Sequence, residues 1–294
     1  MNMNKILVSI ILFFAAVMPS VAQTKDGGIS ADMLREITKQ HKSTAADKAL
    51  FNAIAANNID DLATNYATKG ALNNHFSIET KEQSITDQKR SGRCWMFSGF
   101  NVLRSAFATR TDSLSVELSQ GYLFFWDQLE KSNLFLQGVI DNASKPIDDN
   151  RVQFFFKGPI NDGGTFCGVA DLVDKYGLVP KQIMPETFSS DNTSKATSLI
   201  KSKLREYGLI LRDMVAAGKK QTAIKAEKTR MLTDVYRMLC LVFGEPPTQF
   251  DYAFTDKKGV AKTETKTYTP MSFAKEILGD KQIKGSFIMV MNDP

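Results

Sequence analysis

The sequence is poor in the residues that most metal and nucleotide sites require. It has only two histidines, His41 and His75. No CxxC or HxxxH pair occurs, which excludes the usual zinc-binding patterns. No GxGxxG or Walker loop occurs either. We therefore expect neither a metal nor a nucleotide cofactor.

The sequence also has no concentrated cluster of charges of one sign. The 294 residues include 37 basic and 32 acidic side chains, a net charge of +5, and the basic residues are scattered. Such a diffuse excess is typical of a solvated surface, so we expect no nucleic acid as a primary target. The hydrophobic fraction of 43% and the charged fraction of 23% exclude a disordered chain and a polytopic membrane protein.

The amino terminus has the pattern of a targeting segment. Residues 1–5 are basic, residues 6–18 are apolar apart from Ser9, and S-V-A precedes Gln23. This predicts a signal peptide over residues 1–22 and an exported domain over residues 23–294, periplasmic or extracellular. The alternative is an uncleaved anchor. The apolar run is shorter than the roughly 20 residues of a spanning helix, so we expect no stable membrane anchor.

The exported part contains three cysteines, Cys94, Cys167 and Cys240. An odd number in an exported protein indicates at least one unpaired thiol. The sequence leaves open whether Cys167 and Cys240 pair with each other or stay as free buried thiols.

Hydrophobic periodicity predicts a largely helical chain. One helix is expected to start at Ser30 or Asp32 and to end at about residue 40. Further helices are expected over residues 47–56, 94–110, 114–137, 167–176 and 273–278. Two amphipathic helices are expected over residues 195–243, broken near Gly218, with strands over 249–268 and 286–291 and loops over 71–90 and 141–165. The helix over 94–110 is apolar on most sides, which predicts a buried helix. The aromatic residues at 122–126 are likewise expected in the core.

The segment before this buried helix carries the candidate chemistry. Cys94 begins the helix directly after the Ser91-Gly92 turn. A helix N-terminus stabilises a thiolate, and a glycine lets the chain bend so that a substrate can approach the sulfur. Acyl transfer also needs donors aimed at the developing oxyanion, and the Cys94 backbone N–H and the Gln88 side-chain amide are suitable. The alternatives are a buried inert cysteine and an ordinary loop amide.

These residues resemble the papain-like cysteine peptidases. Their signature C-G-[SA]-C-[WY] is matched by Ser91-Gly92-Arg93-Cys94-Trp95. Ser91 replaces the first cysteine, so the usual neighbouring disulfide is absent, and Arg93 replaces a small residue. Both departures resemble the bleomycin hydrolase / aminopeptidase C branch, whose motif T-[ND]-Q-K-x-S-G-R-C-W is matched by residues 86–95.

The resemblance extends from about residue 73 to the last residue. Further segments similar to this branch occur in the family's order: E-L-S-Q at 117–120, Y-L-F-F-W-D at 122–127, D-G-G at 162–164, Y-G-L-V-P at 176–180, M-P-E-T at 184–187, L-R at 204–205, G-E-P-P at 244–247 and N-D-P at 292–294.

The resemblance implies an α+β, papain-like fold. Its helical half would carry Cys94 on a buried central helix, with a helical insertion over about residues 195–243, and the β-barrel half would be largely missing. Cys94 would be the nucleophile and Gln88 the oxyanion donor. Gly163 and Gly164 would bind the substrate backbone; the alternative for this pair is an ordinary turn. No metal or organic cofactor is implied.

A papain-like site also needs a histidine and an asparagine after the nucleophile. No histidine follows Cys94, and we expect His41 and His75 to be structural or surface residues. The family's histidine and asparagine are therefore expected beyond Pro294. The sequence would then be the N-terminal portion of a longer enzyme, with weak or absent peptidase activity for residues 1–294 alone.

The implied activity is that of a cysteine-type aminopeptidase, which removes N-terminal residues from peptide substrates through a thioester. Members of the branch assemble as homohexamers. One alternative is a catalytically inactive, exported module that keeps the cleft and grips extended peptides. Another is a redox-sensing thiol protein, which leaves Gln88 and the Gly163-Gly164 pair unexplained.

Overall fold

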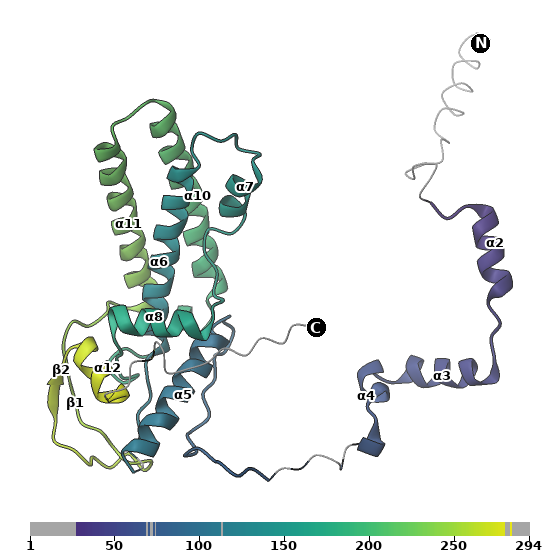
Figure 1. Ribbon diagram of the computed structural model, residues 1–294, viewed down its shortest axis with the longest axis horizontal. Helices are drawn as coiled ribbons and strands as arrows, with labels where there is room; N and C mark the ends of the chain where they lie inside the picture. The colour runs from purple at the N-terminus through teal and green to yellow at the C-terminus, as the bar shows by residue number, and fades with distance from the viewer. Residues whose placement is uncertain are drawn as a thin grey trace, which may run out of the picture. The chain divides into compact units, whose positions relative to one another are not determined.

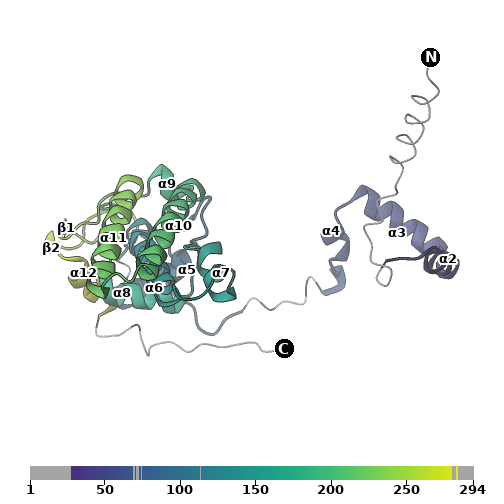
Figure 2. The same ribbon diagram turned by 90° about the horizontal axis from the view of Figure 1, so that it is seen from above.

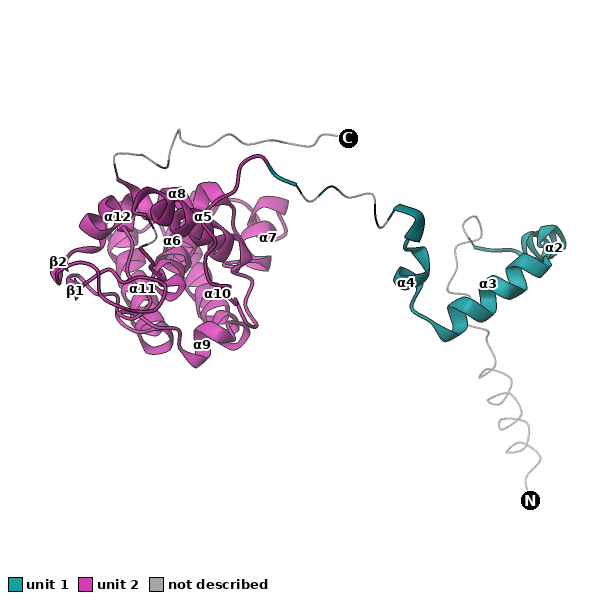
Figure 3. Ribbon diagram, turned by 90° about the horizontal axis from the view of Figure 1, so that it is seen from below, with its two compact units in different colours: residues 1–76 teal, residues 77–294 magenta. Residues whose placement is uncertain are grey.

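The structure, a computed structural model, describes residues 28–68, 70, 73, 75–112, 114–279 and 283. The predicted signal peptide over residues 1–22 and the predicted strand over 286–291 lie outside these residues. The chain divides into two compact units, residues 1–76 and residues 77–294 (Figure 3). The residues with candidate chemistry, from Gln88 onward, all belong to the second unit.

The first unit consists of short helices without a core of their own. Ser30 caps the first helix, where its Oγ accepts a hydrogen bond from the Met33 N–H at 3.1 Å. Thr44 and Asp47 form a reciprocal capping box on the second. No residue of these helices is buried. Their bounds are α2 (Ala31–Gln40), α3 (Ala45–Ala56), α4 (Ile59–Ala63) and the 3₁₀ turn η1 (Tyr66–Thr68).

The second unit is built around three helices, α5 (Cys94–Arg110), α6 (Gln120–Asp141) and α8 (Phe166–Tyr176) (Figure 1). Phe100 and Phe107 of α5 are almost fully buried. Burying one such ring contributes roughly 1.5–3 kcal/mol, so this helix is a main source of core stability. The α8 helix ends at Gly177, whose φ of 77° suits a glycine, and an added Cβ there would lie 2.3 Å from the Pro270 backbone.

A long helical hairpin packs against α6. Its helices are α10 (Ser194–Ala216) and α11 (Gln221–Phe243), and both contact α6 (Figure 2). Gly218, with a φ of 64°, lies in the connection between them. The hairpin confirms the two helices that periodicity predicts over residues 195–243.

A small sheet and the last described helix, α12 (Pro270–Leu278), complete the second unit. Strand β1 (Phe250–Tyr252) pairs antiparallel with β2 (Lys266–Tyr268). A turn at Gly259, whose φ is 81°, lies between the two strands. The rings of Phe254 and Phe273 stack 5.6 Å apart, which joins this region to α12.

Two sequence-based predictions were wrong in detail. The helix expected over 114–137 begins only at Gln120. Before it, Ser115 bridges to Thr255 and Leu118 to Pro180, so this stretch is extended. Inside the loop expected over 141–165 lies another helix, α7 (Asn150–Lys157). Asp149 caps it by accepting hydrogen bonds from two backbone N–H groups, a signal that was present in the sequence.

The fold class is confirmed in its helical part. The described residues are mostly helical and include one two-stranded sheet. Cys94 lies on a buried helix of the core, as expected. Among the residues that the structure describes, no helix combines the length and apolar character needed to cross a membrane.

Candidate active site

Cys94 is the first residue of α5, and its side chain is exposed. This position argues against the alternative of a buried, inert cysteine. Arg93 precedes it as the N-cap residue and makes no side-chain cap hydrogen bond. The first N–H groups of α5 are therefore not used by a capping side chain and can face an anion at the thiol.

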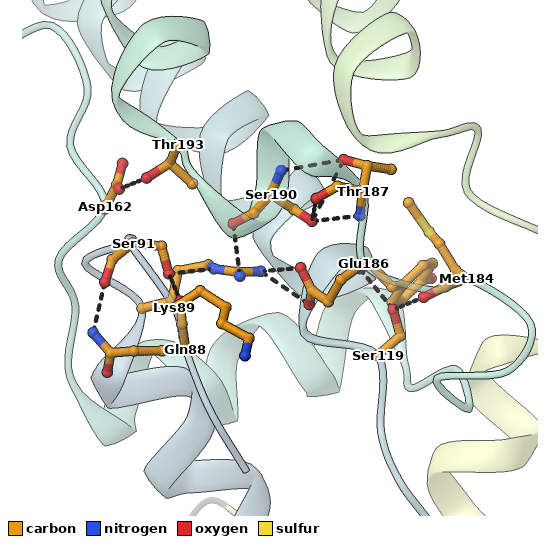
Figure 4. Close-up of polar contacts among 12 residues, drawn as sticks. Gln88, Lys89, Ser91, Ser119, Asp162, Met184, Glu186, Thr187, Ser190 and Thr193 are labelled. Carbon is orange, nitrogen blue, oxygen red and sulfur yellow. Dashed lines mark hydrogen bonds and ion pairs between the residues drawn. The ribbon is translucent and has the colours of Figure 1, made fainter.

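Gln88 lies half-buried on the loop that leads into α5. Its Nε2 donates to the Ser91 carbonyl oxygen at 2.6 Å, and the Ser91 hydroxyl donates to the Gln88 carbonyl oxygen at 2.7 Å (Figure 4). These two bonds close a tight turn. Within it, Lys89 has a left-handed φ of 52°, a conformation that costs a non-glycine residue on the order of 1–3 kcal/mol. The surrounding contacts must hold the turn in this form.

Arg93 points into the core, although it is next to the exposed thiol. Its side chain is fully buried between the rings of Phe97 and Phe124, which lie 5.2 and 5.4 Å from the guanidinium carbon. Its Nη1 donates to both carboxylate oxygens of Glu186, at 3.0 and 2.8 Å, and its Nη2 donates to the Ser190 carbonyl oxygen at 2.8 Å. An arginine is therefore accommodated where the papain signature has a small residue.

The Gly163-Gly164 loop lies against the start of α5. The Trp95 Nε1 donates to the Asp162 carbonyl oxygen at 2.7 Å, and the Gly92 N–H donates to the Asp162 carboxylate at 3.2 Å. An added Cβ at Gly164 would be 2.5 Å from the Trp95 ring, so this glycine packs closely against the indole. The residues around the thiol thus hold the glycine loop beside it. The predicted nucleophile and the predicted peptide-binding pair are brought together.

A lysine on α6 fixes the same loop from another direction. The Lys131 Nζ donates to the Gly163 carbonyl oxygen at 2.7 Å, the Asn161 carbonyl oxygen at 2.8 Å and the Asp127 carboxylate at 2.7 Å. It also lies 5.7 Å from the centre of the Trp95 ring. Burial raises the pKa of Asp127 to about 6, against the opposing effect of the Lys131 charge.

The remaining histidines and cysteines take part in none of the contacts described above. His41 and His75 are exposed and belong to the first unit. Cys167 and Cys240 are half-buried and free in the structure, with no disulfide between them. Burial and the nearby Glu245 raise the pKa of the Cys240 thiol. Among the described residues, no group of three potential metal ligands occurs.

Sequence reasoning missed the residues that support the site. The D-G-G and M-P-E-T segments were noted, but Asp162 and Glu186 were given no role, and Lys131 was not noted at all. A carboxylate directly before a glycine pair was the available signal for Asp162. Its two carboxylate oxygens also accept hydrogen bonds from the hydroxyls of Thr193 and Thr197, which attach the loop to the start of α10.

Comparisons with known proteins find similar aminopeptidases. Aminopeptidase C from Lactobacillus delbrueckii subsp. lactis is 38% identical over 267 residues, which cover 90% of this chain and 59% of that protein. Aminopeptidase C from Streptococcus thermophilus is 34% identical over 268 residues, with the same coverage of 90% and 59%. The chain thus spans about three fifths of the length of these relatives.

The fold also matches a solved structure. The crystal structure of PepW from Lactobacillus rhamnosis is similar with a TM-score of 0.78 and 36% sequence identity, over 87% of this chain and 57% of that one. The sequence model of the Peptidase C1-like family matches residues 28–294. Because this match covers most of the sequence, the chain belongs to the Peptidase C1-like family, that of aminopeptidase C and bleomycin hydrolase.

Proposed function

We propose that this chain carries the nucleophile and the oxyanion donor of a cysteine-type aminopeptidase that acts on peptides. One observation carries the proposal. Cys94 is exposed at the first position of a buried helix, and its neighbours Gly92 and Trp95 hold the glycine loop beside it. This arrangement combines an accessible thiol, helix N–H groups and a peptide-binding edge in one place.

The chemistry follows from the positions of these groups. The Cys94 sulfur attacks the carbonyl carbon of a peptide bond, and a sulfur–carbon bond forms while the carbonyl oxygen gains negative charge. Backbone N–H groups at the start of α5 and the Gln88 amide stabilise this oxygen. The carbon–nitrogen bond then breaks, and the amine leaves with the proton that the thiol gave up. Water hydrolyses the remaining thioester.

The glycine pair orients the peptide for this attack. Gly163 and Gly164 are both exposed. An extended peptide can therefore approach the loop closely and hydrogen-bond to its backbone. A chain that bound peptides in this way without turnover would be the inactive binding module considered above.

We propose further that the protein is exported. The basic, apolar and small-residue pattern of residues 1–22 supports cleavage before Gln23. A secreted or periplasmic peptidase would act on peptides outside the cytoplasm.

A single mass-spectrometric experiment tests both proposals. The intact mass of the protein from its native source is measured before and after treatment with a peptidyl epoxide. We expect an amino terminus at Gln23 and one adduct, located on Cys94. The variant Cys94→Ala should form no adduct, whereas the matched variant Cys167→Ala should react like the wild type.

Two results would contradict these proposals separately. An adduct spread over Cys94, Cys167 and Cys240 would mean that Cys94 is not a peptide-directed nucleophile. A mature protein that retains residues 1–22 would contradict export by cleavage and leave the peptidase proposal intact.

A further inference from the structure

The segment from Glu186 to Ser190 lies behind the nucleophile and has no role in the chemistry described so far. It belongs to the M-P-E-T stretch and to the short helix α9 (Phe188–Asp191). Figure 4 shows Glu186 and Ser190 facing the turn that carries Gln88 and Ser91. The residue that joins the two sides is Arg93.

A continuous path of hydrogen bonds leads from this segment to the oxyanion donor. Glu186 and the Ser190 carbonyl hold two nitrogens of the buried Arg93 guanidinium. The third nitrogen, Nε, donates to the Ser91 hydroxyl at 2.9 Å. That hydroxyl donates to the Gln88 carbonyl oxygen, and the Gln88 amide returns a bond to the Ser91 carbonyl.

We infer that Arg93, Glu186 and Ser91 are positioning residues that aim the Gln88 side-chain amide at the oxyanion. This inference rests on the proposed function, because it assigns a task to Gln88. Arginine suits the role because its rigid, planar fork presents donors in fixed directions and never loses its charge. A lysine could not reach the same acceptors with the same geometry.

The Glu186 end of this path is itself firmly attached. The Thr187 and Ser190 side chains form a capping box at α9, and the Thr187 hydroxyl donates to the Val242 carbonyl oxygen at 2.7 Å. Near the other end, the Arg90 N–H donates to the Asp191 carbonyl oxygen at 2.9 Å. The last turn of α11 is thereby connected to the turn that holds the oxyanion donor.

The test compares two reactions of the Cys94 sulfur. A peptidyl aldehyde adds reversibly: the sulfur–carbon bond forms, the carbonyl π bond breaks, and the thiol proton passes to the new oxygen, which occupies the oxyanion position. Iodoacetamide alkylates the same sulfur with loss of iodide and forms no such oxygen. Misplacement of Gln88 should therefore weaken aldehyde binding and leave the alkylation rate unchanged.

Two variants of the full chain are compared with a matched control. Ser91→Ala interrupts the path but keeps the Arg93–Glu186 ion pair, so folding is least affected. Glu186→Gln removes the charge behind Arg93. The control is Ser84→Ala, because the Ser84 hydroxyl also accepts a hydrogen bond from a buried arginine, Arg104, at 2.7 Å.

We expect Ser91→Ala and Glu186→Gln to weaken aldehyde binding at least about tenfold, since loss of one oxyanion donor costs about 10²–10³ in rate. Iodoacetamide alkylation should match the wild type, and Ser84→Ala should change neither reaction. Wild-type aldehyde binding in both variants would overturn the inference but keep the proposed function. An equal loss in both reactions would also overturn it, because it would show a general structural effect. Wild-type protein that binds the aldehyde no better than Cys94→Ala would overturn the proposed function and the inference with it.

Discussion

Gly163 and Gly164 are neighbours in the sequence, yet an added methyl group would meet very different surroundings. At Gly164 the new Cβ would lie 2.5 Å from a carbon of the Trp95 ring, which is almost fully buried. At Gly163 the nearest atom would be the Asn161 Oδ1, at an ordinary 3.5 Å. Because Trp95 is held by its bond to Asp162, the indole cannot move away without loss of that bond.

We therefore predict that Gly164→Ala lowers the free energy of unfolding by about 1–3 kcal/mol, the usual cost of overpacking. It should also weaken binding of a peptidyl aldehyde, because the loop shifts relative to Cys94. Urea unfolding and inhibitor titration measure the two effects. Gly163→Ala is the matched control and should have little effect on stability. Equal stability for both variants would contradict the close packing of Gly164 on Trp95.

The α6 helix carries a buried carboxylate whose ionisation should affect stability. The pKa of Asp127 is raised from its ordinary 3.8 to about 6, chiefly by burial. Between these values the folded protein holds a proton that the unfolded chain has released. The contribution of Asp127 to stability is therefore complete below about pH 4 and is lost as the pH rises through 6.

We predict that the unfolding free energy of the wild type, relative to that of Asp127→Asn, falls by at most about 3 kcal/mol between pH 4 and 6 and then levels off. Urea unfolding of both proteins across this range measures it. Glu130→Gln on the same helix should show the opposite slope, at pH values below about 4.5, where the wild type loses stability as the pH falls. Burial raises the pKa of Glu130, but Lys175 and the Tyr176 hydroxyl outweigh it and hold that pKa below its ordinary value. A pH-independent difference for Asp127→Asn would contradict the prediction.

The elements themselves show what hydrophobic spacing can and cannot predict. The helix from Cys94 to Arg110 was predicted with its observed bounds, because its apolar residues repeat with the helical period over its whole length. The start of α6 was missed although Leu114, Val116 and Leu118 alternate with polar residues, which is the period of a strand. Tertiary partners such as Thr255 and Pro180, distant in the sequence, decide that conformation.

For a similar reason, the sequence predicted some residues of the candidate site and missed others. Cys94, Gln88 and the glycine pair were predicted as site residues because they form local sequence motifs. Their supports, Arg93 and Lys131, act through partners far away in the sequence, and no spacing rule indicates such contacts. Only the structure shows that the Arg93 side chain points into the core and not toward the thiol.

On the scale of the whole molecule, the two units differ in how their apolar residues are used. The second unit contains the large buried cluster, whereas the large apolar side chains of the described helices before residue 77 are exposed, as Leu34 and Phe51 are at 55% and 70%. Helices without burial have little tertiary stabilisation and open readily.

We predict that limited digestion of the intact protein with trypsin cleaves first in the first unit, at exposed positions such as Arg35 and Lys48. Sites on the packed helices of the second unit, such as Arg230 on α11, should be cut much later. Mass spectrometry of the early products identifies the sites in order. Early cleavage within α10 or α11 would contradict this difference in local stability.

The contacts of Lys131 determine which backbone groups of the glycine loop remain free to bind a peptide. An ammonium group has three hydrogens, and Lys131 directs them to Asp127, Asn161 and the Gly163 carbonyl. The Gly163 N–H in turn donates to the Asn161 Oδ1 at 3.0 Å. The Gly163 N–H is thus used within the protein and its carbonyl oxygen already accepts one hydrogen bond, whereas no described residue hydrogen-bonds to the Gly164 backbone. We therefore expect a bound peptide to hydrogen-bond mainly to the Gly164 backbone, and the separation between Gly164 and the Cys94 sulfur would determine which peptide bond is cut.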